Sequence, residues 1–426
     1  MQQDIINKVA GSSNDIPDVT VIGAGIIGVS IAERLQYEGK KVLLIDRQGI
    51  GQGCSKGNAG HFATDIILPL ANFSTLLRAP KYLLDPLGPL TIDLAYLPKL
   101  LPWLTRFTWS AMPHKTKLTI EVLKKLNQPS ISRFKELLER TKLQQMMTQK
   151  GALTIYSTKP AEKQNIKHAN LVSQHGVEVQ ILSKGQLREL EPEFNNSING
   201  ALFYPNTAHS INPYKLVDGL AKSFTQLGGK TQNLNATAIK NGENDCVDIQ
   251  TDRGILKSKE VIVACGAWSK TLIESIGHKV PLETERGYHY MLPKPDVMIN
   301  RPVTCYERSF VMTPMEEGLR LAGTVELAGL DKPKNDERAR QLFRNAKELL
   351  PSIKEDDAST WMGHRPSLPD SLPVIGRSNI NANVLFAFGH QHLGLTQAAV
   401  TADLMSDLSN HRMARQLETQ LSINRF

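Results

Sequence analysis

The sequence predicts an α/β fold in two parts: a helix-covered parallel sheet, and an α+β region whose sheet is mixed. Near the N-terminus, two apolar strands enclose a glycine-rich turn and an amphipathic helix, within residues 19–46. Another apolar strand, residues 260–263, runs into a turn of small residues. Shorter strand-like pieces lie between residues 280 and 330, followed by a charged amphipathic helix. The first two observations predict the parallel sheet, and the third predicts a mixed sheet with a covering helix.

The N-terminal segment has the arrangement of a nucleotide-binding crossover. The strand Val19–Ile22 leads directly into Gly23-x-Gly25-x-x-Gly28, a helix follows, and a second strand ends on Asp46, eighteen positions after the last glycine. Gly23 permits the tight turn, Gly25 lets the backbone approach a pyrophosphate, and Gly28 allows the helix to lie close to the strand. Asp46 can accept hydrogen bonds from ribose hydroxyls. Together these features predict a Rossmann-type domain that binds an adenine dinucleotide.

After Gly60, a proline-rich and then helical stretch replaces the next expected strand. Apolar residues recur at helical spacing between residues 115 and 143, and Pro129 divides this run into two helices. Strand-like pieces follow at 152–156 and 200–204. We therefore expect a second domain to be inserted into the nucleotide-binding domain.

The last part of the chain returns to the nucleotide-binding domain. A strand at 383–388 precedes a turn that opens a helix at 394–396. The nucleotide-binding domain is thus expected to be discontinuous and to comprise residues 16–64, 205–275 and 356–412. The remaining expected parts are a substrate-binding or cap domain, residues 65–204 and 276–355, and a loose N-terminal arm, residues 1–15.

The net charge of +8 and the 41% hydrophobic content suit a two-domain enzyme that attracts anions. Such an anion is a phosphorylated cofactor, a carboxylate substrate or an acidic membrane surface. Basic residues are scattered among acidic ones, which argues against nucleic-acid binding. The four cysteines are widely spaced, so neither a metal site nor a disulfide framework is indicated, and a reducing, cytoplasmic compartment fits best.

The segment Leu90–Trp109 comes closest to a membrane span but does not have the composition of one. Its prolines and its charged residues Asp93, Lys99 and Arg106 argue against crossing a bilayer. Its leucine and aromatic side chains suit either a cap buried over the active site or a peripheral contact with the cytoplasmic face of a membrane. The buried cap is the more common arrangement for such side chains.

Several further motifs give the chain a family resemblance. Beside the N-terminal turn with Asp46-Arg47, they are Gly53-Cys54-Ser55-x-Gly57-Asn58-Ala59-Gly60, Ala264-Cys265-Gly266-Ala267-Trp268-Ser269, Arg286-Gly287-Tyr288-His289, Arg365-Pro366, and Gly389-His390 with Leu393-Gly394-Leu395-Thr396. Through these motifs, the chain from Val19 to about Leu408 resembles flavoproteins of the D-amino-acid oxidase superfamily, within its bacterial D-amino-acid dehydrogenase branch. The resemblance implies a bound FAD and an enzyme that acts on CH–NH or CH–NH2 donors.

The resemblance also implies how the FAD is held. Ser55 offers a hydroxyl to a phosphate oxygen, and the run from Gly57 to Gly60 lies flat beside the isoalloxazine. The helix that opens at Gly394 presents its N-terminus to the flavin N1 and C2 carbonyl. Asp46 stands where the family usually has glutamate, which is one methylene longer. The expected FAD-binding residues are Gly23, Gly25, Ile26, Ile27, Gly28, Asp46, Arg47, Cys54, Ser55, Gly57, Asn58, Ala59, Gly60, Ala264, Gly266, Trp268, Gly389, Gly394, Leu395 and Thr396.

In the reaction that the resemblance implies, the α-hydrogen of an amino acid leaves as hydride to flavin N5 and an imine forms. Such a reaction requires a cation for the substrate carboxylate rather than a nucleophile. Arg365 is the first choice, because a guanidinium binds both carboxylate oxygens and Pro366 restricts its backbone. The alternative is a structural arginine in a proline-rich turn.

Other side chains are expected to line the substrate site. Tyr288 can donate to a carboxylate, and a histidine beside the flavin can orient the substrate or accept the amine proton. Taken singly, each histidine also fits a structural hydrogen-bonding role. The candidates are Tyr288, His289, His61 and His392, then His390, with Tyr306 and Glu326 as weaker ones.

Two stretches, 312–326 and 389–396, resemble bacterial D-hydroxyproline dehydrogenases. The first expected substrate is therefore cis-4-hydroxy-D-proline or D-proline, with other D-amino acids second. Three alternatives stay open: an oxygen-using glycine, sarcosine or other secondary-amine oxidase, a nicotinamide-linked dehydrogenase, and a flavin-bearing subunit of a hetero-oligomer that does no catalysis itself. The electron acceptor is oxygen, a quinone or an acceptor protein, and the segment Leu90–Trp109 favours an acceptor in or near the membrane.

Overall fold

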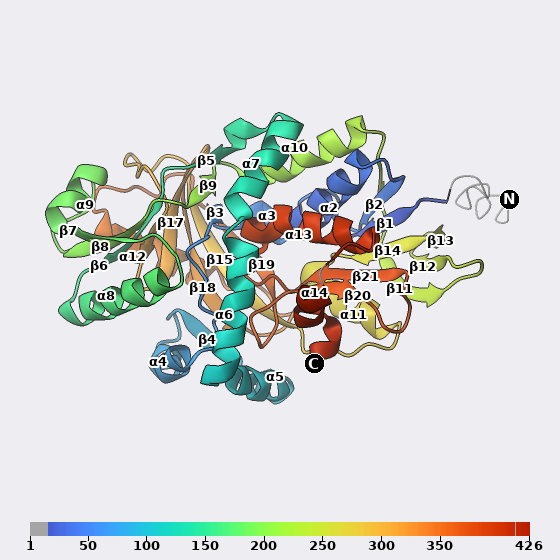
Figure 1. The fold of residues 1–426 in the computed structure, drawn as a ribbon. Helices are drawn as coiled ribbons and strands as arrows, with labels where there is room; N and C mark the ends of the chain where they lie inside the picture. Colours follow the sequence, from blue (N-terminus) through green and yellow to red (C-terminus); the bar gives the residue numbers. More distant parts are fainter. Residues whose placement is uncertain (1–15, 414) are drawn as a thin grey trace.

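The computed structural model describes residues 16–413 and 415–426, so the expected N-terminal arm, residues 1–15, lies outside the described residues. Two large sheets lie side by side, one in each half of the molecule (Figure 1). Helices α6 (Pro113–Asn127) and α7 (Ser130–Thr141) stand between these halves in this view. Pro129 separates the two helices, as the sequence predicts.

One sheet has six strands in the order β10-β2-β1-β14-β21-β20. All neighbouring strands are parallel except β20, which runs antiparallel to β21 at the edge. The strands are β1 (Val19–Ile22), β2 (Val42–Asp46), β10 (Lys230–Asn233), β14 (Glu260–Val263), β20 (Val374–Arg377) and β21 (Val384–Phe388). These strands come from three separate parts of the chain. The predicted α/β class with a parallel sheet is confirmed. The domain boundaries stay predictions.

Helices pack on one face of this sheet, and a small antiparallel sheet with one helix packs on the other. The first group is α2 (Ile26–Tyr37), α10 (Pro213–Gln226) and α13 (Gly394–Ser409). The second group is β11 (Ala236–Asn241), β12 (Val247–Thr251), β13 (Gly254–Ser258) and α11 (Ser269–Glu274). Because both faces are covered, the inner strands β1 and β21 are buried along their whole length, whereas the edge strand β10 is polar and exposed.

The other large sheet has nine strands in the order β19-β15-β18-β17-β16-β6-β8-β7, with β4 paired to β18. Two of its pairs are parallel and the others antiparallel, so the predicted mixed sheet is present. The strands are β4 (Leu90–Ile92), β6 (Ala152–Tyr156), β7 (Gln180–Ser183), β8 (Gly200–Tyr204), β15 (Glu283–Leu292), β16 (Val303–Cys305), β17 (Phe310–Met315), β18 (Gly318–Leu327) and β19 (Ser359–Ser367). The expected boundary 356–412 assigns β19 to the nucleotide-binding domain, whereas its pairing with β15 places it in this sheet.

Shorter elements complete the fold around these sheets. The predicted helix after residue 335 is α12 (Asp336–Leu349), which packs on β15 and β18. The others are α3 (Cys54–Gly57), α4 (Phe73–Leu83), α5 (Leu97–Ser110), α8 (Lys159–Gln174), α9 (Lys184–Leu190), α14 (Arg415–Leu421), the 3-10 helices η1 (Gln144–Met146), η2 (Gly266–Trp268) and η3 (Ile423–Arg425), and a small sheet of β3 (His61–Phe62), β9 (Ala208–Ser210) and β5 (Met147–Thr148).

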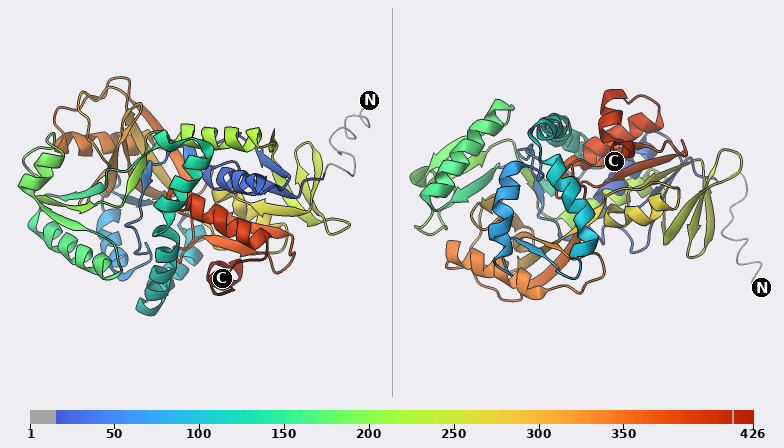
Figure 2. Two further views of the ribbon diagram at one scale, coloured as in Figure 1. Left: turned by 45° about the horizontal axis from the view of Figure 1, so that its top comes forward. Right: turned by 90° about the horizontal axis from the view of Figure 1, so that it is seen from below.

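The segment Leu90–Trp109 forms β4 and most of α5, at the same end of the molecule as α4 (Figure 2, right). Leu100 and Trp103 are buried against Leu327 of β18, as a cap would be. Leu94 and Trp109 face outward, with 81% and 55% of their surface exposed. Among residues 16–413 and 415–426, no helix has the length and apolar character needed to cross a bilayer.

Candidate functional site

A cavity of about 1240 Å³ lies where the two large sheets meet. Its wall includes the turns that follow β1, β2, β14 and β21, which are the carboxyl ends of the parallel strands. It also includes β15, β18 and β19 of the mixed sheet and the inner sides of α4 and α5. Because this volume exceeds that of a typical small-molecule pocket, the cavity has room for a dinucleotide and a substrate together.

The glycines of the first turn are required by close backbone contacts. Gly23 has a φ of +109°, and a Cβ there would lie 2.4 Å from the carbonyl oxygen of Ala264. A Cβ on Gly28 would lie 1.8 Å from the carbonyl oxygen of Gly23. Gly28 therefore lets α2 approach the turn, as predicted, and it does not itself line the cavity.

Asp46 and Trp268 mark one end of the cavity. Asp46 Oδ2 accepts from the amide of Ala24 at 2.8 Å, and Oδ1 accepts from the amide of Gln48 at 2.7 Å. The guanidinium of Arg47 lies 4.3 Å from the centre of the Trp268 ring. The loop 234–237, which the sequence did not point to, lines the same end. The carboxylate thus holds the turn together and keeps lone pairs for ribose hydroxyls.

Ser55 connects α3 to the start of α2. Its Oγ accepts from the amide of Ile26 at 2.8 Å, which leaves its hydroxyl hydrogen to donate to a phosphate oxygen. Ile27 lines the cavity beside it. The Cys54 thiol donates to the carbonyl of His364 at 2.7 Å, and burial raises its pKa to about 11, so it stays neutral.

Side chains of the mixed sheet contact the run from Gly57 to Gly60 and fix its position. A Cβ on Gly57 would lie 2.3 Å from the Trp361 ring, so only glycine fits. The Nδ1 of His289 lies 2.8 Å from the Gly57 carbonyl, and its ring stacks on Trp361. Burial lowers the pKa of His289 to about 3, so the ring is neutral. His289 was expected to line the substrate site, but its hydrogen bond makes it a support for the Gly57 loop.

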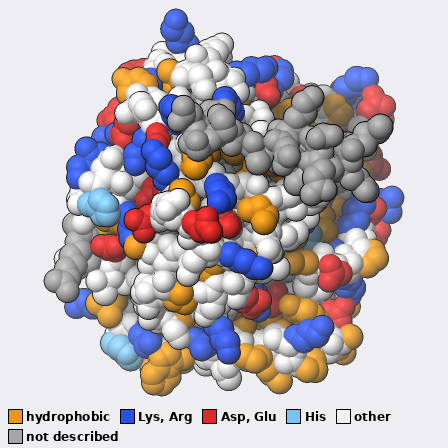
Figure 3. Space-filling view, turned by 90° about the vertical axis from the view of Figure 1, so that its right-hand side faces the viewer, with side chains coloured by type: hydrophobic (Ala, Val, Ile, Leu, Met, Phe, Trp, Pro, Cys, Tyr) orange, Lys and Arg blue, Asp and Glu red, His pale blue; other side chains and the backbone are white. Residues whose placement is uncertain are grey.

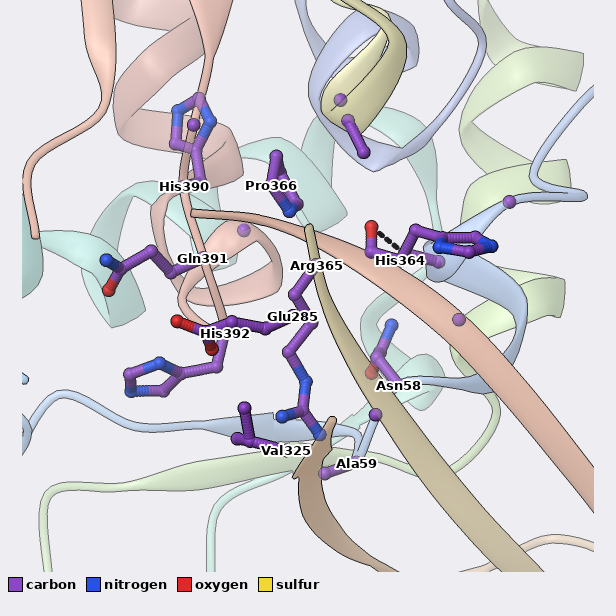
Figure 4. A pocket seen from close by; sticks show the side chains of 18 of the residues that line it. Asn58, Ala59, Glu285, Val325, His364, Arg365, Pro366, His390, Gln391 and His392 are labelled. Atoms are coloured by element: carbon purple, nitrogen blue, oxygen red, sulfur yellow. Dashed lines mark hydrogen bonds between the residues drawn. The ribbon is translucent and has the colours of Figure 1, made fainter. Parts of the chain in front are cut away.

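The rest of this run is fixed at Asn58. Its Oδ1 accepts from the amide of Gly60 at 2.7 Å, and its carbonyl accepts from Arg320 at 2.8 Å. Ala59 follows with its side chain on the cavity wall (Figure 4). These bonds hold the backbone in one conformation beside the expected isoalloxazine position.

The turns after β14 and β21 lie at the cavity wall, and of the residues that the sequence assigns to the cofactor there, Thr396 is the exception. Ala264, Gly266, Gly389, Gly394 and Leu395 line the cavity. α13 begins at Gly394, so its positive end points toward the cavity. Thr396 is fully buried and does not line the cavity. Its Oγ1 accepts from the amide of Ala63 at 3.0 Å, which ties α13 to the segment after β3. The expected cofactor contact of Thr396 is therefore replaced by a structural one.

Three neutral histidines surround the middle of the cavity. The pKa of His61 and that of His392 are each lowered to about 4 by burial, and the pKa of His390 to about 3. His390 Nε2 lies 3.0 Å from Thr401 Oγ1 and is therefore satisfied. His61 Nε2 is buried without a hydrogen-bond partner in the described part of the protein. A group bound in the cavity would satisfy it, which fits a flavin with several polar edge atoms.

Arg365 projects from β19 into the cavity (Figure 4). Its Nη1 donates to the carbonyl of Thr324 at 3.2 Å, and a Cβ on Gly287 would lie 2.3 Å from its Nη2. The glycine of the Arg-Gly-Tyr-His motif therefore makes room for the guanidinium. Within the described residues no carboxylate is at ion-pair distance from Arg365, and Glu285 on β15 is the nearby acid. A guanidinium in this state is suited to bind a carboxylate.

Tyr288 is among the residues that line the cavity, but its hydroxyl bonds elsewhere. Its hydroxyl donates to Glu326 Oε2 at 2.5 Å and accepts from the amide of Asn335, on the α12 side of the sheet. Burial and Glu326 raise the pKa of Tyr288 to about 12. The expectation that this hydroxyl binds the substrate carboxylate is therefore wrong, because alternation along β15 points it to the opposite face from Glu285.

Besides the loop 234–237, the lining residues that sequence reasoning missed or underrated include four with polar side chains. Glu285, Thr324 and Arg78 were not predicted, and Tyr306 was only a weak candidate. A longer prediction for β15 would have found Glu285, since it lies two residues before Gly287 on the same face. In the described residues, no group of three or more His, Cys, Asp or Glu side chains is placed to hold a metal ion.

The cavity and the fold agree with what is found among known proteins. A family profile described as "FAD dependent oxidoreductase" (DAO) matches residues 18–408. A D-amino-acid oxidase of Bradyrhizobium diazoefficiens is 33% identical over 397 residues, which cover 92% of this chain and 94% of that protein. A D-amino acid dehydrogenase of Vibrio atlanticus is 26% identical over 421 residues, covering 96% and 100%.

The fold is also similar to that of a solved enzyme structure. The glycine oxidase of Geobacillus kaustophilus superposes with a TM-score of 0.75 at 20% identity, over 96% of this chain and 99% of that one. At this identity the similarity concerns the fold. The glycine-lined turns, the orphaned His61 nitrogen and the room in the cavity together suit an FAD molecule.

Proposed function

The chain belongs to the family of FAD-dependent oxidoreductases, with FAD as its cofactor, and we propose that it oxidises the carbon–nitrogen bond of a D-amino acid or cyclic imino acid. One observation carries this proposal: the guanidinium of Arg365 lies on the cavity wall, and no carboxylate of the described residues forms an ion pair with it. The α-carboxylate of an amino acid suits such a site. The relatives named D-amino-acid oxidase and D-amino acid dehydrogenase support the substrate class.

The residues around Arg365 have separate parts in the proposed reaction. Bound FAD supplies the acceptor for the hydride that leaves the α-carbon, and an imine is the product. Arg365 binds both carboxylate oxygens and so fixes the direction of the α-hydrogen. His61 and His392 are neutral near pH 7, because burial lowers the pKa of each to about 4, and either ring can accept a hydrogen bond from the amine.

Within this class, D-hydroxyproline and D-proline are the proposed first substrates. The support is the resemblance of residues 312–326 and 389–396 to D-hydroxyproline dehydrogenases. The first stretch forms most of the β17–β18 hairpin and brings Thr324 and Val325 to the cavity wall. The remaining alternatives are an oxygen-using glycine or sarcosine oxidase and a flavin subunit without catalysis of its own. The family assignment removes the nicotinamide-linked alternative.

Turnover of the purified chain with an artificial electron acceptor tests these choices. We expect cis-4-hydroxy-D-proline or D-proline to give the highest kcat/KM, ahead of D-alanine, glycine and sarcosine. If kcat/KM is higher for glycine or sarcosine, the protein is a glycine or sarcosine oxidase and the proposed substrate is wrong. No turnover of any of these compounds by the isolated flavoprotein would support the subunit alternative.

We further propose that the protein binds the cytoplasmic face of an anionic membrane through α4 and α5 and passes electrons to a quinone there. The exposed apolar side chains include Phe73 (67%), Leu77 (66%), Leu84 (85%), Leu94 (81%) and Leu101 (52%). Residues 72–118 contain six lysines and arginines against two acids. The space-filling view, which faces the right-hand side of Figure 1 and so not α4, shows hydrophobic side chains beside lysines and arginines along its lower edge (Figure 3). An anionic bilayer complements both properties.

Vesicle co-sedimentation tests the membrane contact. The FAD-loaded protein should pellet with vesicles containing phosphatidylglycerol and stay in solution with phosphatidylcholine vesicles. Replacing Leu84, Leu94 and Leu101 by Ser together should abolish pelleting, whereas Ile255→Ser, at an exposed site on β13, should not. Equal binding to both vesicle types, or none, would contradict the proposal. Washed membranes with bound protein should then reduce a quinone analogue faster than they consume oxygen.

A further inference from the structure

The far end of the cavity holds a second arginine that the proposed reaction does not use. Arg78 on α4 and Tyr306, which directly follows β16, both line the cavity. The Nη1 of Arg78 donates to the hydroxyl of Tyr306 at 3.1 Å, and the guanidinium lies 5.7 Å from the centre of the ring. The tyrosine thus holds the guanidinium at the wall of the cavity, and Nη2, which has no hydrogen-bond partner among the described residues, is left to bind a ligand.

The positive charge of Arg78 is not neutralised within the described part of the chain. Its other contact is a long bond of 3.4 Å to the carbonyl of Ser74, which is uncharged. The two acids of the α4–α5 segment are engaged elsewhere: Asp85 accepts from the amide of Leu87, and Asp93 pairs with Lys332. A partly buried guanidinium that contacts only neutral oxygens is suited to bind an anionic ligand.

The spacing between the two arginines limits the size of a shared ligand. Arg365 donates to Thr324 on β18, and Tyr306 follows β16, with β17 between these strands. Two strand spacings amount to about 10 Å. Arg365 on β19 and Arg78 on α4 both line the cavity. A ligand that contacts both must therefore carry two anionic groups several bonds apart.

We propose that Arg78, held by Tyr306, binds the distal carboxylate of an acidic D-amino acid of glutamate length. This inference rests on the proposed oxidation, in which Arg365 binds the α-carboxylate. A cyclic imino acid uses the same α-carboxylate site and leaves the Arg78 end to water. Acidic and cyclic substrates thus share one reacting centre and differ in whether the distal subsite is filled.

Paired substrates give the most direct test. For the wild-type holoenzyme we expect kcat/KM for D-glutamate to exceed that for D-norvaline, a neutral substrate of similar length. Arg78→Met should lower the ratio of these two values at least tenfold, mainly through the KM of D-glutamate, and Arg78→Lys should restore part of it. Lys81→Met removes one charge from the exposed side of the same helix and should leave the ratio unchanged. An unchanged ratio in Arg78→Met would overturn the subsite.

Ligand binding separates failure of the subsite from failure of the proposed function. Glutarate, a dicarboxylate without an amine, should perturb the flavin absorption with a Kd at least tenfold lower than that of butyrate, and Arg78→Met should remove this difference. Glutarate binding without oxidation of any amino acid would keep the anion subsite and reject the reaction. Oxidation of D-norvaline with equal binding of glutarate and butyrate would keep the reaction and reject the subsite.

Discussion

Arg365 and Glu285 are register partners on the adjacent strands β19 and β15, yet no ion pair joins them. Glu285 Oε1 instead accepts from Ser367 Oγ at 2.6 Å, and Ser367 Oγ in turn accepts from Gln391 Nε2 at 3.2 Å. Burial raises the pKa of Glu285, while the bond from Ser367 and the nearby Arg365 act to lower it. The guanidinium therefore keeps its capacity to bind a carboxylate from outside the chain.

Arg365→Met should remove the site for the α-carboxylate. Loss of a bidentate, charge-assisted contact costs about 3 kcal/mol, so we expect kcat/KM for the best amino acid to fall on the order of a hundredfold. For a substrate without a carboxylate, kcat/KM of the variant should be close to that of the wild type. Arg253→Met, at an exposed turn, is the matched control and should leave the kinetics unchanged. Normal kinetics in Arg365→Met would assign this arginine a structural role.

Tyr288→Phe should weaken the fold more than catalysis. The substitution removes the buried hydrogen bond from the Tyr288 hydroxyl to Glu326. Its loss should lower the free energy of unfolding by about 1–3 kcal/mol. Urea unfolding of the FAD-loaded protein measures this change. KM should stay within about twofold, because the hydroxyl points away from Arg365. A large rise of KM with unchanged stability would return Tyr288 to the substrate site.

Gly28→Ala should impair FAD binding. A Cβ at this position would lie 1.8 Å from the carbonyl oxygen of Gly23, so α2 must move away from the turn that holds the pyrophosphate. We expect the Kd for FAD, measured by fluorescence quenching during reconstitution, to rise at least tenfold. Gly185→Ala on α9 is the control, since its nearest atom would be 4.0 Å away. Wild-type affinity in Gly28→Ala would contradict this account of the turn.

Buried histidines should make the folded state sensitive to acid. The pKa values of His61, His209 and His392 are lowered to about 4, whereas unfolded histidine titrates near 6.5. Between these values the unfolded chain binds more protons, so stability should fall as pH decreases from about 6.5 toward about 4. Thermal unfolding with saturating FAD should show a lower Tm at about pH 5 than at about pH 7. His209→Gln should reduce this difference, and an equal Tm at both values would contradict it.

The glycine turns of the cavity could be recognised from the sequence, because each of these glycines stands where a side chain would not fit. A Cβ on Gly28 would meet the Gly23 carbonyl within the same turn, whereas Gly23 and Gly57 are constrained by Ala264 and Trp361, which are distant in the sequence. All three constraints leave a glycine in a recognisable motif. The helix start at Gly394 and the strand before Cys265 follow from apolar periodicity in the same way.

The substrate half could not be predicted to the same extent, because it depends on how distant strands align. The polar start of β15 hid Glu285, and only the register with β19 places it beside Arg365. Which face Tyr288 takes depends on the alternation along β15, and its partner on β18 depends on an extra residue that β18 carries between Gly323 and Glu326. Nothing in the sequence around Arg78 indicates that α4 covers the cavity, since this contact is purely tertiary.

Anaerobic titration of the purified holoenzyme with amino acids tests the central claim most directly. The visible absorption of the bound flavin should be bleached stoichiometrically by D-proline, hydroxy-D-proline or another D-amino acid, and not by the corresponding L-isomer. A protein that binds FAD but keeps its full absorption with every D-amino and imino acid would contradict the account.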